Sequence, residues 1–324
     1  MKKALIVGID EYPSSPLSGC VNDAQAMASL LETNGDGSPN FEVKLECNVK
    51  TKANFLDLLN NLFCKGDSEI ALLYFSGHGT DEGSGALVTP DYSGRDFGVT
   101  MTEVLRMANE SKSKNKIIIL DCCFSGKLGG MGVSNATEAY LGEGVTIMTA
   151  SNKDEVSIED RYTGHGVFTN LLIEGLKGGA ADIGGNITPA SLYSFVDQSL
   201  GEWEQRPLFK TNISRFLPIR NIEAKVSKTI LRKLSKYFLN STDEYPLDPS
   251  YEFTNTPEVE HTVVEPFACD ENIQKFKELQ LYESVGLIEP VGTEHMYFAA
   301  MENKSCKLTA LGLHYWRLSK DKRF

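Results

Sequence analysis

Short apolar runs alternate with stretches of helical periodicity over about the first 220 residues. The runs are rich in β-branched or aromatic residues, and polar residues or glycines bound each of them. The clearest are residues 4–9, 41–45, 70–75, 117–120 and 145–148, and the helical stretches are 20–31, 53–63, 102–108 and 168–176. Strands that alternate with helices pair in parallel through right-handed crossovers, and continuous apolar strands are covered on both faces. The pattern therefore predicts an α/β fold, a three-layer sandwich with a mostly parallel central sheet.

The alternation ends near residue 221. A helical pattern at 226–239 is followed by a polar, acidic stretch at 240–266 that is rich in Pro, Thr and Ser. A second compact unit follows, with a helix from residue 271, short extended segments near 296–300 and 305–308, and a closing helix at 308–318. We therefore expect a first domain at 1–220, a helix and acidic connector at 221–270, and a small α+β domain at 271–324.

Composition restricts the class of protein. The chain has 324 residues, of which 41% are hydrophobic and 23% charged, as in soluble globular proteins. No apolar stretch is long enough to span a membrane, and the apolar run after Lys2 and Lys3 stops at Asp10, which favours a first strand over a secretory signal. The net charge of -12 disfavours nucleic acid as a partner. Seven cysteines without C-x-x-C spacing indicate neither a disulfide framework nor a zinc site, so we expect a cytoplasmic protein.

Two short motifs follow consecutive apolar runs. Ser76-Gly77-His78-Gly79 comes after the run at 70–75, and Asp121-Cys122-Cys123-Phe124-Ser125-Gly126 comes after the run at 117–120. In a parallel sheet, ligands bind in the crevice outside the carboxyl ends of the strands. An imidazole and a thiol at neighbouring strand ends predict a Cys–His pair, because a nearby imidazolium lowers the pKa of a thiol and the thiolate is the nucleophile.

The two motifs together resemble the caspase and metacaspase family of cysteine peptidases. Further segments that look like this family are residues 4–12, 17–24, 166–169 and 205–209, so the resemblance covers roughly residues 3–215. It implies that His78 is the general acid and base and that Cys123 is the nucleophile. It also implies an oxyanion hole made by the backbone N–H groups of Gly79 and Cys123.

Two other residues compete for these roles. Strand alternation places Cys122 on the opposite face from Asp121 and Cys123, so we interpret Cys122 as buried packing. His165 precedes a helical stretch and follows no apolar run, and we interpret it as a loop histidine.

The resemblance further implies that Cys20, Asp23, Ser76 and Asp121 line the primary specificity pocket. On a helix, Cys20 and Asp23 share one face because they are three residues apart. Two carboxylates in one cavity repel each other unless a cation enters. A guanidinium can bind a carboxylate through two hydrogen bonds, whereas an ammonium binds as a point charge. We therefore expect protein substrates cleaved after Arg, then Lys, and not after Asp.

The sequence departs from metacaspases that need calcium. Asp81, Glu82, Asp91 and Asp96 are scattered after the histidine, and no carboxylate follows Cys123 closely. Calcium takes six to eight oxygen ligands, so we predict that the protein needs no metal and no cofactor. The glycine-rich segment at 125–144 contains Lys127, where an acidic pocket could direct self-cleavage. An active-site loop that stays uncut is the equally open alternative.

The C-terminal unit resembles a winged-helix module. Acidic residues outnumber basic ones over 221–324, which disfavours DNA binding despite the basic residues Lys320, Lys322 and Arg323 near the end. The resemblance to prokaryotic caspase-like proteins implies a stress or antiviral-defence effector that a small molecule, such as a nucleotide-like messenger, or a protein partner activates. The leading hypothesis is a cysteine endopeptidase with a regulatory module, and the alternative is a catalytically silent, caspase-like binding scaffold. A DNA-binding regulator is the third, less favoured hypothesis.

Overall fold

A computed structural model describes residues 1–80, 85–94, 96–122, 141–150, 165–201, 207–213, 215, 217–258 and 263–324. Cys123 and Lys127 therefore lie outside the described residues. The chain divides into two compact units, Met1–Glu223 and Ala224–Phe324. None of the helices in the described ranges has the length and apolar character required to cross a membrane.

The described part of the first unit is organised around a six-stranded sheet with the strand order β10-β8-β7-β3-β1-β2. The strands are β1 (Lys2–Gly8), β2 (Phe41–Cys47), β3 (Ile70–Ser76), β7 (Asn115–Asp121), β8 (Val145–Thr149) and β10 (Leu208–Asn212). All neighbouring pairs are parallel except β10 with β8. The predicted mostly parallel sheet is thus confirmed.

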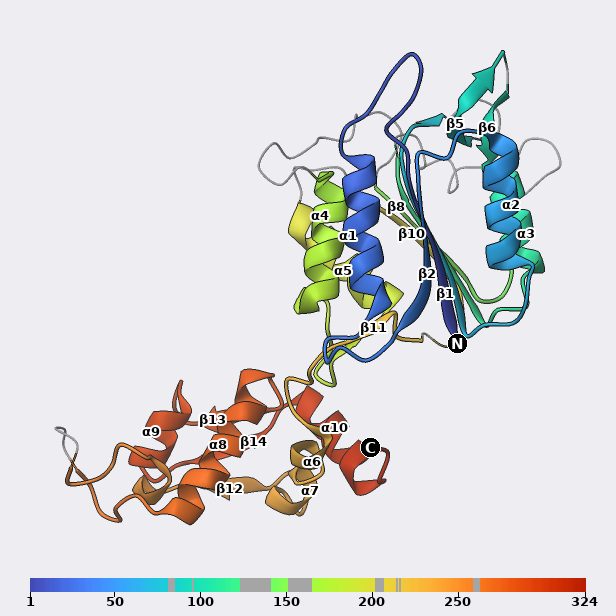
Figure 1. The fold of residues 1–324 in the computed structure, drawn as a ribbon. Coiled ribbons are helices and arrows are strands. Elements are labelled where there is room, and N and C mark those ends of the chain that lie inside the picture. Colours follow the sequence, from blue (N-terminus) through green and yellow to red (C-terminus); the bar gives the residue numbers. More distant parts are fainter. Residues whose placement is uncertain are drawn as a thin grey trace. The chain divides into compact units, whose positions relative to one another are not determined.

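Helices cover both faces of this sheet. On one face lie α1 (Cys20–Glu32), α4 (Val167–Glu174) and α5 (Pro189–Leu200), and on the other lie α2 (Lys52–Phe63) and α3 (Met101–Glu110) (Figure 1). Alternate residues of β3 enter the two cores: Leu73 and Phe75 pack with α2, while Leu72 and Tyr74 belong to the cluster that contains α1 and α4 residues. Burial of both strand faces explains the continuous apolar runs.

The first unit also contains shorter strands and a π-helical turn. Near the carboxyl ends of the main strands, β4 (Gly79–Thr80), β5 (Ala86–Ser93) and β6 (Asp96–Thr100) form an antiparallel sheet. A π-helical turn, η2 (Gly175–Gly179), follows α4, and β9 (Asn186–Ile187) pairs with β11 (Arg220–Asn221).

The second unit contains a three-stranded antiparallel sheet of order β12-β14-β13 within its described residues. Its elements are α6 (Lys228–Leu231), α7 (Leu234–Tyr237), β12 (Glu244–Pro246), η3 (Pro249–Tyr251), α8 (Asp270–Ser284), β13 (Ile288–Val291), α9 (Met296–Met301), β14 (Ser305–Leu308) and α10 (Ala310–Lys320).

Two expectations for the second unit were wrong in detail. The helix expected at 226–239 is two short helices, α6 and α7. The segment expected to be extended near 296–300 is the helix α9, which buries Met296, Ala299 and Ala300. These residues follow helical spacing, and Met and Ala favour helices.

Part of the polar stretch at 240–266 is packed into the second unit. Asn255 has 0% exposure, and its side-chain amide donates to the carbonyl oxygens of Pro249, Val264 and Pro266 at 3.0, 2.7 and 3.1 Å. A buried amide with this many partners joins distant parts of a loop. The composition of this stretch resembles a linker, but the described residues around Asn255 are folded.

Candidate active site

The ends of β3 and β7, where the two motifs begin, lie side by side at the carboxyl edge of the sheet. Ser76, the last residue of β3, stands opposite Asp121, the last residue of β7. One residue further on, the Gly77 N–H donates to the Asp121 backbone carbonyl at 3.4 Å. Parallel pairing therefore brings together segments that are more than forty residues apart in sequence. Cys123 follows Asp121 by two positions and lies outside the described residues.

His78 is held by Tyr12, a residue that no sequence motif singled out. The His78 backbone N–H donates to the Tyr12 phenolic oxygen at 3.0 Å, and the two ring centroids are 4.5 Å apart. The Tyr12 hydroxyl donates to the Val88 carbonyl at 3.3 Å, and burial raises the pKa of Tyr12, so the phenol stays protonated. The His78 Nε2 lies 2.7 Å from the Ser15 carbonyl oxygen. A carbonyl only accepts, so Nε2 donates in this arrangement.

Glycine at position 77 is required by this packing. A Cβ at Gly77 would lie 2.6 Å from the Tyr12 hydroxyl and 2.8 Å from the Phe75 ring. The glycine before the histidine thus lets Tyr12 approach the strand end closely enough to hold the His78 backbone. A buried tyrosine that follows the first strand carries no sequence signal for this role, because the contact depends on the parallel pairing of β1 and β3.

Asp10 positions the first turn of α1. Its two carboxylate oxygens accept from the backbone N–H groups of Cys20 and Val21 at 2.9 and 3.2 Å. Carboxylates are favourable at helix N-termini because the N–H groups there lack partners within the helix. Asp10 therefore fixes the turn that carries Cys20 and Asp23 against the end of β1.

The residues expected in the specificity pocket lie together. The Ser76 hydroxyl donates to Asp23 Oδ2 at 3.4 Å and also hydrogen-bonds the Cys20 thiol. A Cβ at Gly166 would lie 2.9 Å from Asp121 Oδ2 and 3.5 Å from Asp23 Oδ2, so both carboxylates face the same backbone position. This proximity was expected from the resemblance to metacaspases, but the contribution of the segment before α4 was not.

Both acidic side chains are buried. Asp23 is 2% exposed and Asp121 is 5% exposed. The pKa of Asp23 is raised to about 6, mainly by burial and to a smaller extent by the negative charge of Asp121. The Thr169 hydroxyl donates to Asp121 Oδ2 at 2.5 Å and also contacts the Tyr74 hydroxyl at 2.6 Å. Two carboxylates at this depth are costly unless a positive charge enters.

His165 lies in the loop before α4, as expected, and its side chain contacts Asp23. Its Nδ1 lies 2.6 Å from Asp23 Oδ1 and 3.2 Å from the Asn22 side-chain nitrogen. The Gly166 N–H donates to Asp23 Oδ2 at 3.4 Å. The segment before α4 thus contacts the Asp23 carboxyl, and a search for residues at strand ends could not find this contact.

The two other cysteine thiols near the site have different environments from a reactive thiolate. Cys122 is 3% exposed and belongs to the core, as strand alternation predicts. Burial raises the pKa of the Cys20 thiol well above its usual value, so Cys20 stays a neutral thiol. The Cys20 thiol therefore lacks the lowered pKa that activates a nucleophilic cysteine.

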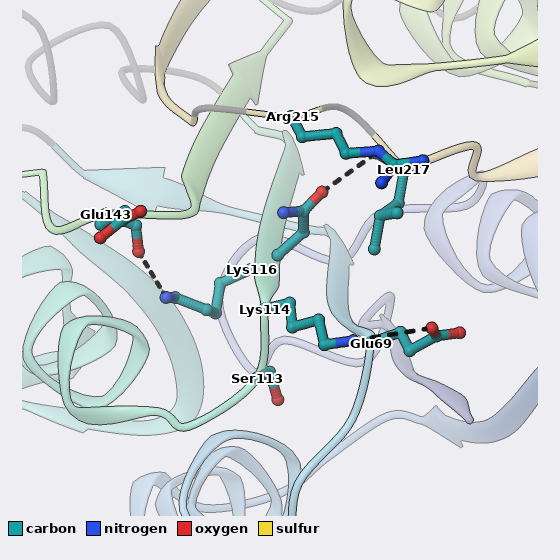
Figure 2. A pocket seen from close by; sticks show the side chains of 8 residues that line it. Glu69, Ser113, Lys114, Lys116, Glu143, Arg215 and Leu217 are labelled. Atoms are coloured by element: carbon teal, nitrogen blue, oxygen red, sulfur yellow. Dashed lines mark hydrogen bonds and ion pairs between the residues drawn. The ribbon is translucent and has the colours of Figure 1, made fainter.

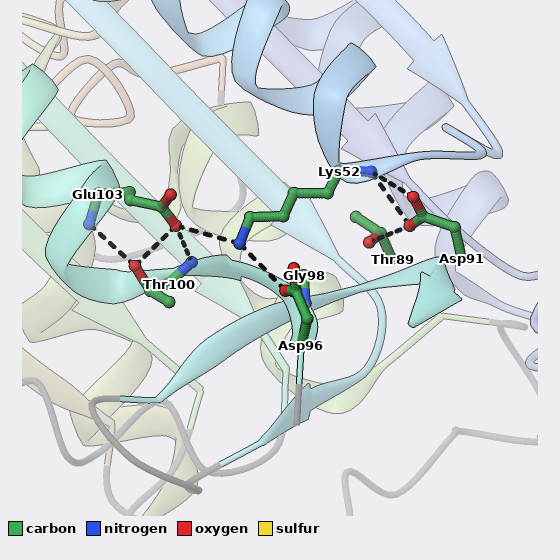
Figure 3. Close-up of polar contacts among 7 residues, drawn as sticks. All are labelled: Lys52, Thr89, Asp91, Asp96, Gly98, Thr100 and Glu103. Atoms are coloured by element: carbon green, nitrogen blue, oxygen red, sulfur yellow. Dashed lines mark hydrogen bonds and ion pairs between the residues drawn. The ribbon is translucent and has the colours of Figure 1, made fainter. Parts of the chain in front are cut away.

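Two of the acidic residues considered for calcium have other partners. Lys52 Nζ lies 3.0 Å from Asp96 Oδ1, and the backbone N–H at the start of α2 donates to both oxygens of Asp91 at 3.1 and 3.2 Å (Figure 3). Asp91 also accepts from Thr89 at 2.6 Å. These carboxylates therefore cap α2 and join it to the β5–β6 hairpin. Asp81 and Glu82 lie outside the described residues.

A pocket of about 570 Å³ lies at the opposite edge of the sheet, where β3, β7 and β8 begin (Figure 2). It is lined by Glu69, Ser113, Lys114, Asn115, Lys116, Glu143, Arg215 and Leu217. Lys116 Nζ donates to the Glu143 carbonyl oxygen at 2.6 Å, and Lys114 Nζ lies 3.9 Å from Glu69. Since protein groups already contact these lysines, we assign no ligand to this pocket.

Comparisons with known proteins show similarity to a known family in the first unit. The family described as Caspase domain matches residues 1–217. A crystal structure of a protein from Geobacter sulfurreducens is similar, with a TM-score of 0.51, 15% identity, and coverage of 68% of this chain and 99% of that chain. The crystal structure of caspase-1 from Spodoptera frugiperda has a TM-score of 0.48 and 16% identity, over 68% of this chain and 90% of that one. No curated protein matches the sequence.

Proposed function

Since this chain belongs to the caspase-domain family of cysteine peptidases, we propose that it is a cysteine endopeptidase that cleaves proteins after Arg and, less efficiently, after Lys. The observation that carries the specificity is the buried acidic pair, Asp23 and Asp121, at the same sheet edge as His78. A substrate guanidinium between the carboxylates relieves their repulsion and can bind in a bidentate manner. A substrate carboxylate would add a third negative charge.

The proposed chemistry is acyl transfer through a thioester. The Cys123 thiolate adds to the carbonyl carbon of the scissile amide, and the backbone N–H groups of Gly79 and Cys123 stabilise the resulting oxyanion. His78 gives a proton to the leaving amine as the C–N bond breaks. It then takes a proton from a water molecule, which attacks the thioester and releases the acid product and the Cys123 thiol. The support for this assignment is the family membership and the position of His78 after β3.

A peptide panel tests the proposed specificity. Fluorogenic peptides that differ only in Arg, Lys, citrulline or Asp before the scissile bond are compared with the full-length protein. We expect kcat/KM to be highest for Arg and lower for Lys, and activity on Asp to be absent. A preference for Asp would contradict the acidic specificity pocket. Complete inactivity on all peptides and on denatured protein would favour the silent scaffold.

Chelation is expected to leave the activity unchanged. Asp91 and Asp96 already bind backbone N–H groups and Lys52, so they would have to give up these partners to hold calcium. The measurement is the Arg-peptide rate in EDTA and after calcium is added back. A rate that disappears in EDTA and returns with calcium would show a metal requirement.

Self-cleavage after Lys127 is a further prediction of the same specificity. A basic residue in a segment next to the nucleophile satisfies the requirement for a positive charge in the acidic pocket. Intact-mass spectrometry of protein incubated under the conditions in which it cleaves Arg peptides is expected to reveal two fragments that end at Lys127 and begin at Leu128. The Cys123→Ala protein is the control and should stay whole. Fragments in both proteins would indicate another protease.

We assign a regulatory role to the second unit, Ala224–Phe324, in a signal-activated stress or antiviral-defence effector. The resemblance of its sequence to a winged-helix module and the three-stranded antiparallel sheet among its helices support this assignment. The full chain is assayed on Arg peptides with and without a panel of cyclic nucleotides. Stimulation by one member supports a nucleotide signal. Full activity of the purified protein without any addition would argue against a required activator.

A further inference from the structure

His165 places a basic side chain beside the buried carboxyl group of Asp23. Its Nδ1 lies 2.6 Å from Asp23 Oδ1, and the side chains of His165 and Asp23 are 18% and 3% exposed. The residue enters from the segment before α4, while Asp23 comes from the first turn of α1. The contact therefore joins the segment before α4 to the first turn of α1. A role for His165 in substrate selection rests on the proposed specificity for basic residues.

A proton must lie between the His165 nitrogen and the Asp23 oxygen at this distance. A neutral imidazole that carries this proton on Nδ1 donates to the Asp23 carboxylate, and an imidazolium donates more strongly. A neutral side chain in place of His165 would leave Asp23 and Asp121 to repel each other directly.

The groups that face Asp23 come from four elements. They are Cys20 on α1, Tyr74 and Ser76 on β3, Asp121 on β7, and His165 and Gly166 in the segment before α4. Burial and Asp121 favour the protonated form of Asp23, whereas the hydrogen bond and charge of His165 lower the pKa of Asp23. His165 thus opposes the two effects that would neutralise this carboxyl.

We propose that His165 is a positioning residue for substrate specificity, which keeps Asp23 ionised and holds its Oδ1 so that Oδ2 can receive the basic side chain of the substrate. In the free protein, Oδ2 has long contacts of 3.4 Å with both the Ser76 hydroxyl and the Gly166 N–H. A guanidinium N–H at the usual 2.7–2.9 Å would be a stronger partner than either. His165 does not touch the reacting bond and acts through Asp23.

The test is the pH dependence of the His165→Ala protein. We expect the acidic limb of kcat/KM for the Arg peptide to shift by about one pH unit or more toward higher pH, because Asp23 then holds its proton more tightly. The change in kcat/KM should come from KM and not from kcat, and activity should approach that of the wild type above about pH 8.5. The citrulline peptide, which lacks the charge, should keep its weak activity and its pH profile. His295→Ala, an exposed histidine in the second unit, is the matched control.

The outcomes separate the inference from the proposed function. An unshifted acidic limb in His165→Ala, or an equal loss of activity at every pH, would overturn the role of His165 while cleavage after Arg stands. If the wild type does not cleave basic peptides, the proposed specificity fails by itself.

Thermal melting of Cys123→Ala proteins with and without His165→Ala is a readout that needs no activity. In the parent protein, Tm should fall as the pH rises through the pKa of Asp23. Without His165 this pKa is higher, so the fall in Tm should continue to higher pH. Identical pH dependence in the two proteins would show that His165 and Asp23 do not share a proton.

Discussion

Replacing His78 with alanine is expected to lower kcat/KM for Arg peptides about 10⁴-fold, the upper range for loss of a general acid and base. Without the imidazole, the Cys123 thiol has no nearby base and the leaving amine has no proton donor. Cys123→Ala should be at least as damaging. Because the two groups act as a unit, the double variant should be no worse than the more damaging single variant.

The fold should survive this change. The His78 ring is partly exposed and contacts the Tyr12 ring and the Ser15 carbonyl, while the backbone N–H that binds Tyr12 is unaffected by the substitution. We therefore expect a melting temperature close to that of the wild type, together with wild-type circular dichroism. His314→Ala, an exposed histidine of the second unit, is the control for the loss of an imidazole elsewhere. Activity of His78→Ala within tenfold of the wild type would refute the catalytic assignment.

Replacing Asp23 with asparagine should have opposite effects on stability and activity. Truncating one partner of a buried, hydrogen-bonded charge pair costs about 2–5 kcal/mol. We therefore expect kcat/KM for the Arg peptide to fall about 100- to 1000-fold, with a smaller fall for the citrulline peptide. Asp57→Asn on α2 changes an exposed carboxylate on the other side of the sheet and should leave both rates unchanged.

The stability change follows from the pKa of Asp23. Folding raises it from the usual 3.8 to about 6, because burial and Asp121 disfavour the carboxylate. The folded protein therefore binds this proton more tightly than the unfolded chain. This contribution to the free energy of unfolding is complete below about pH 4 and is lost as the pH rises through about 6. Two pKa units correspond to about 3 kcal/mol, the upper limit of the loss at pH 8.

Asparagine carries no charge at any pH and avoids this loss. At pH 8 we expect Asp23→Asn to melt several degrees above the wild type, and at pH 4 we expect the difference to vanish or reverse. Differential scanning calorimetry of Cys123→Ala proteins across this range checks the prediction without interference from self-cleavage. A variant that is less stable than its parent at pH 8 would show that the Asp23 carboxylate is satisfied in the free protein.

The pattern of apolar residues predicted the strands of the first unit correctly, because these strands are buried on both faces. Residues 70–75 read as a continuous apolar run, and the structure buries alternate members in two separate cores. The second unit was harder to predict. Its short helices are stabilised by tertiary contacts more than by long periodic patterns, so the segment near 296–300 was wrongly expected to be extended.

The local order of residues along this chain determined its layered α/β architecture, the placement of Ser76 and Asp121 at strand ends, and the shared helix face of Cys20 and Asp23. Each of these depends on a repeat of two or about 3.6 residues, which can be read from neighbouring positions. The roles of Asp10, Tyr12 and His165 were decided by folding in three dimensions. Their hydrogen-bond partners lie from ten to 142 positions away in the sequence. Hydrogen bonds act only at short range, so these pairs form only where the packing of α1, β3 and α4 brings the polar groups together.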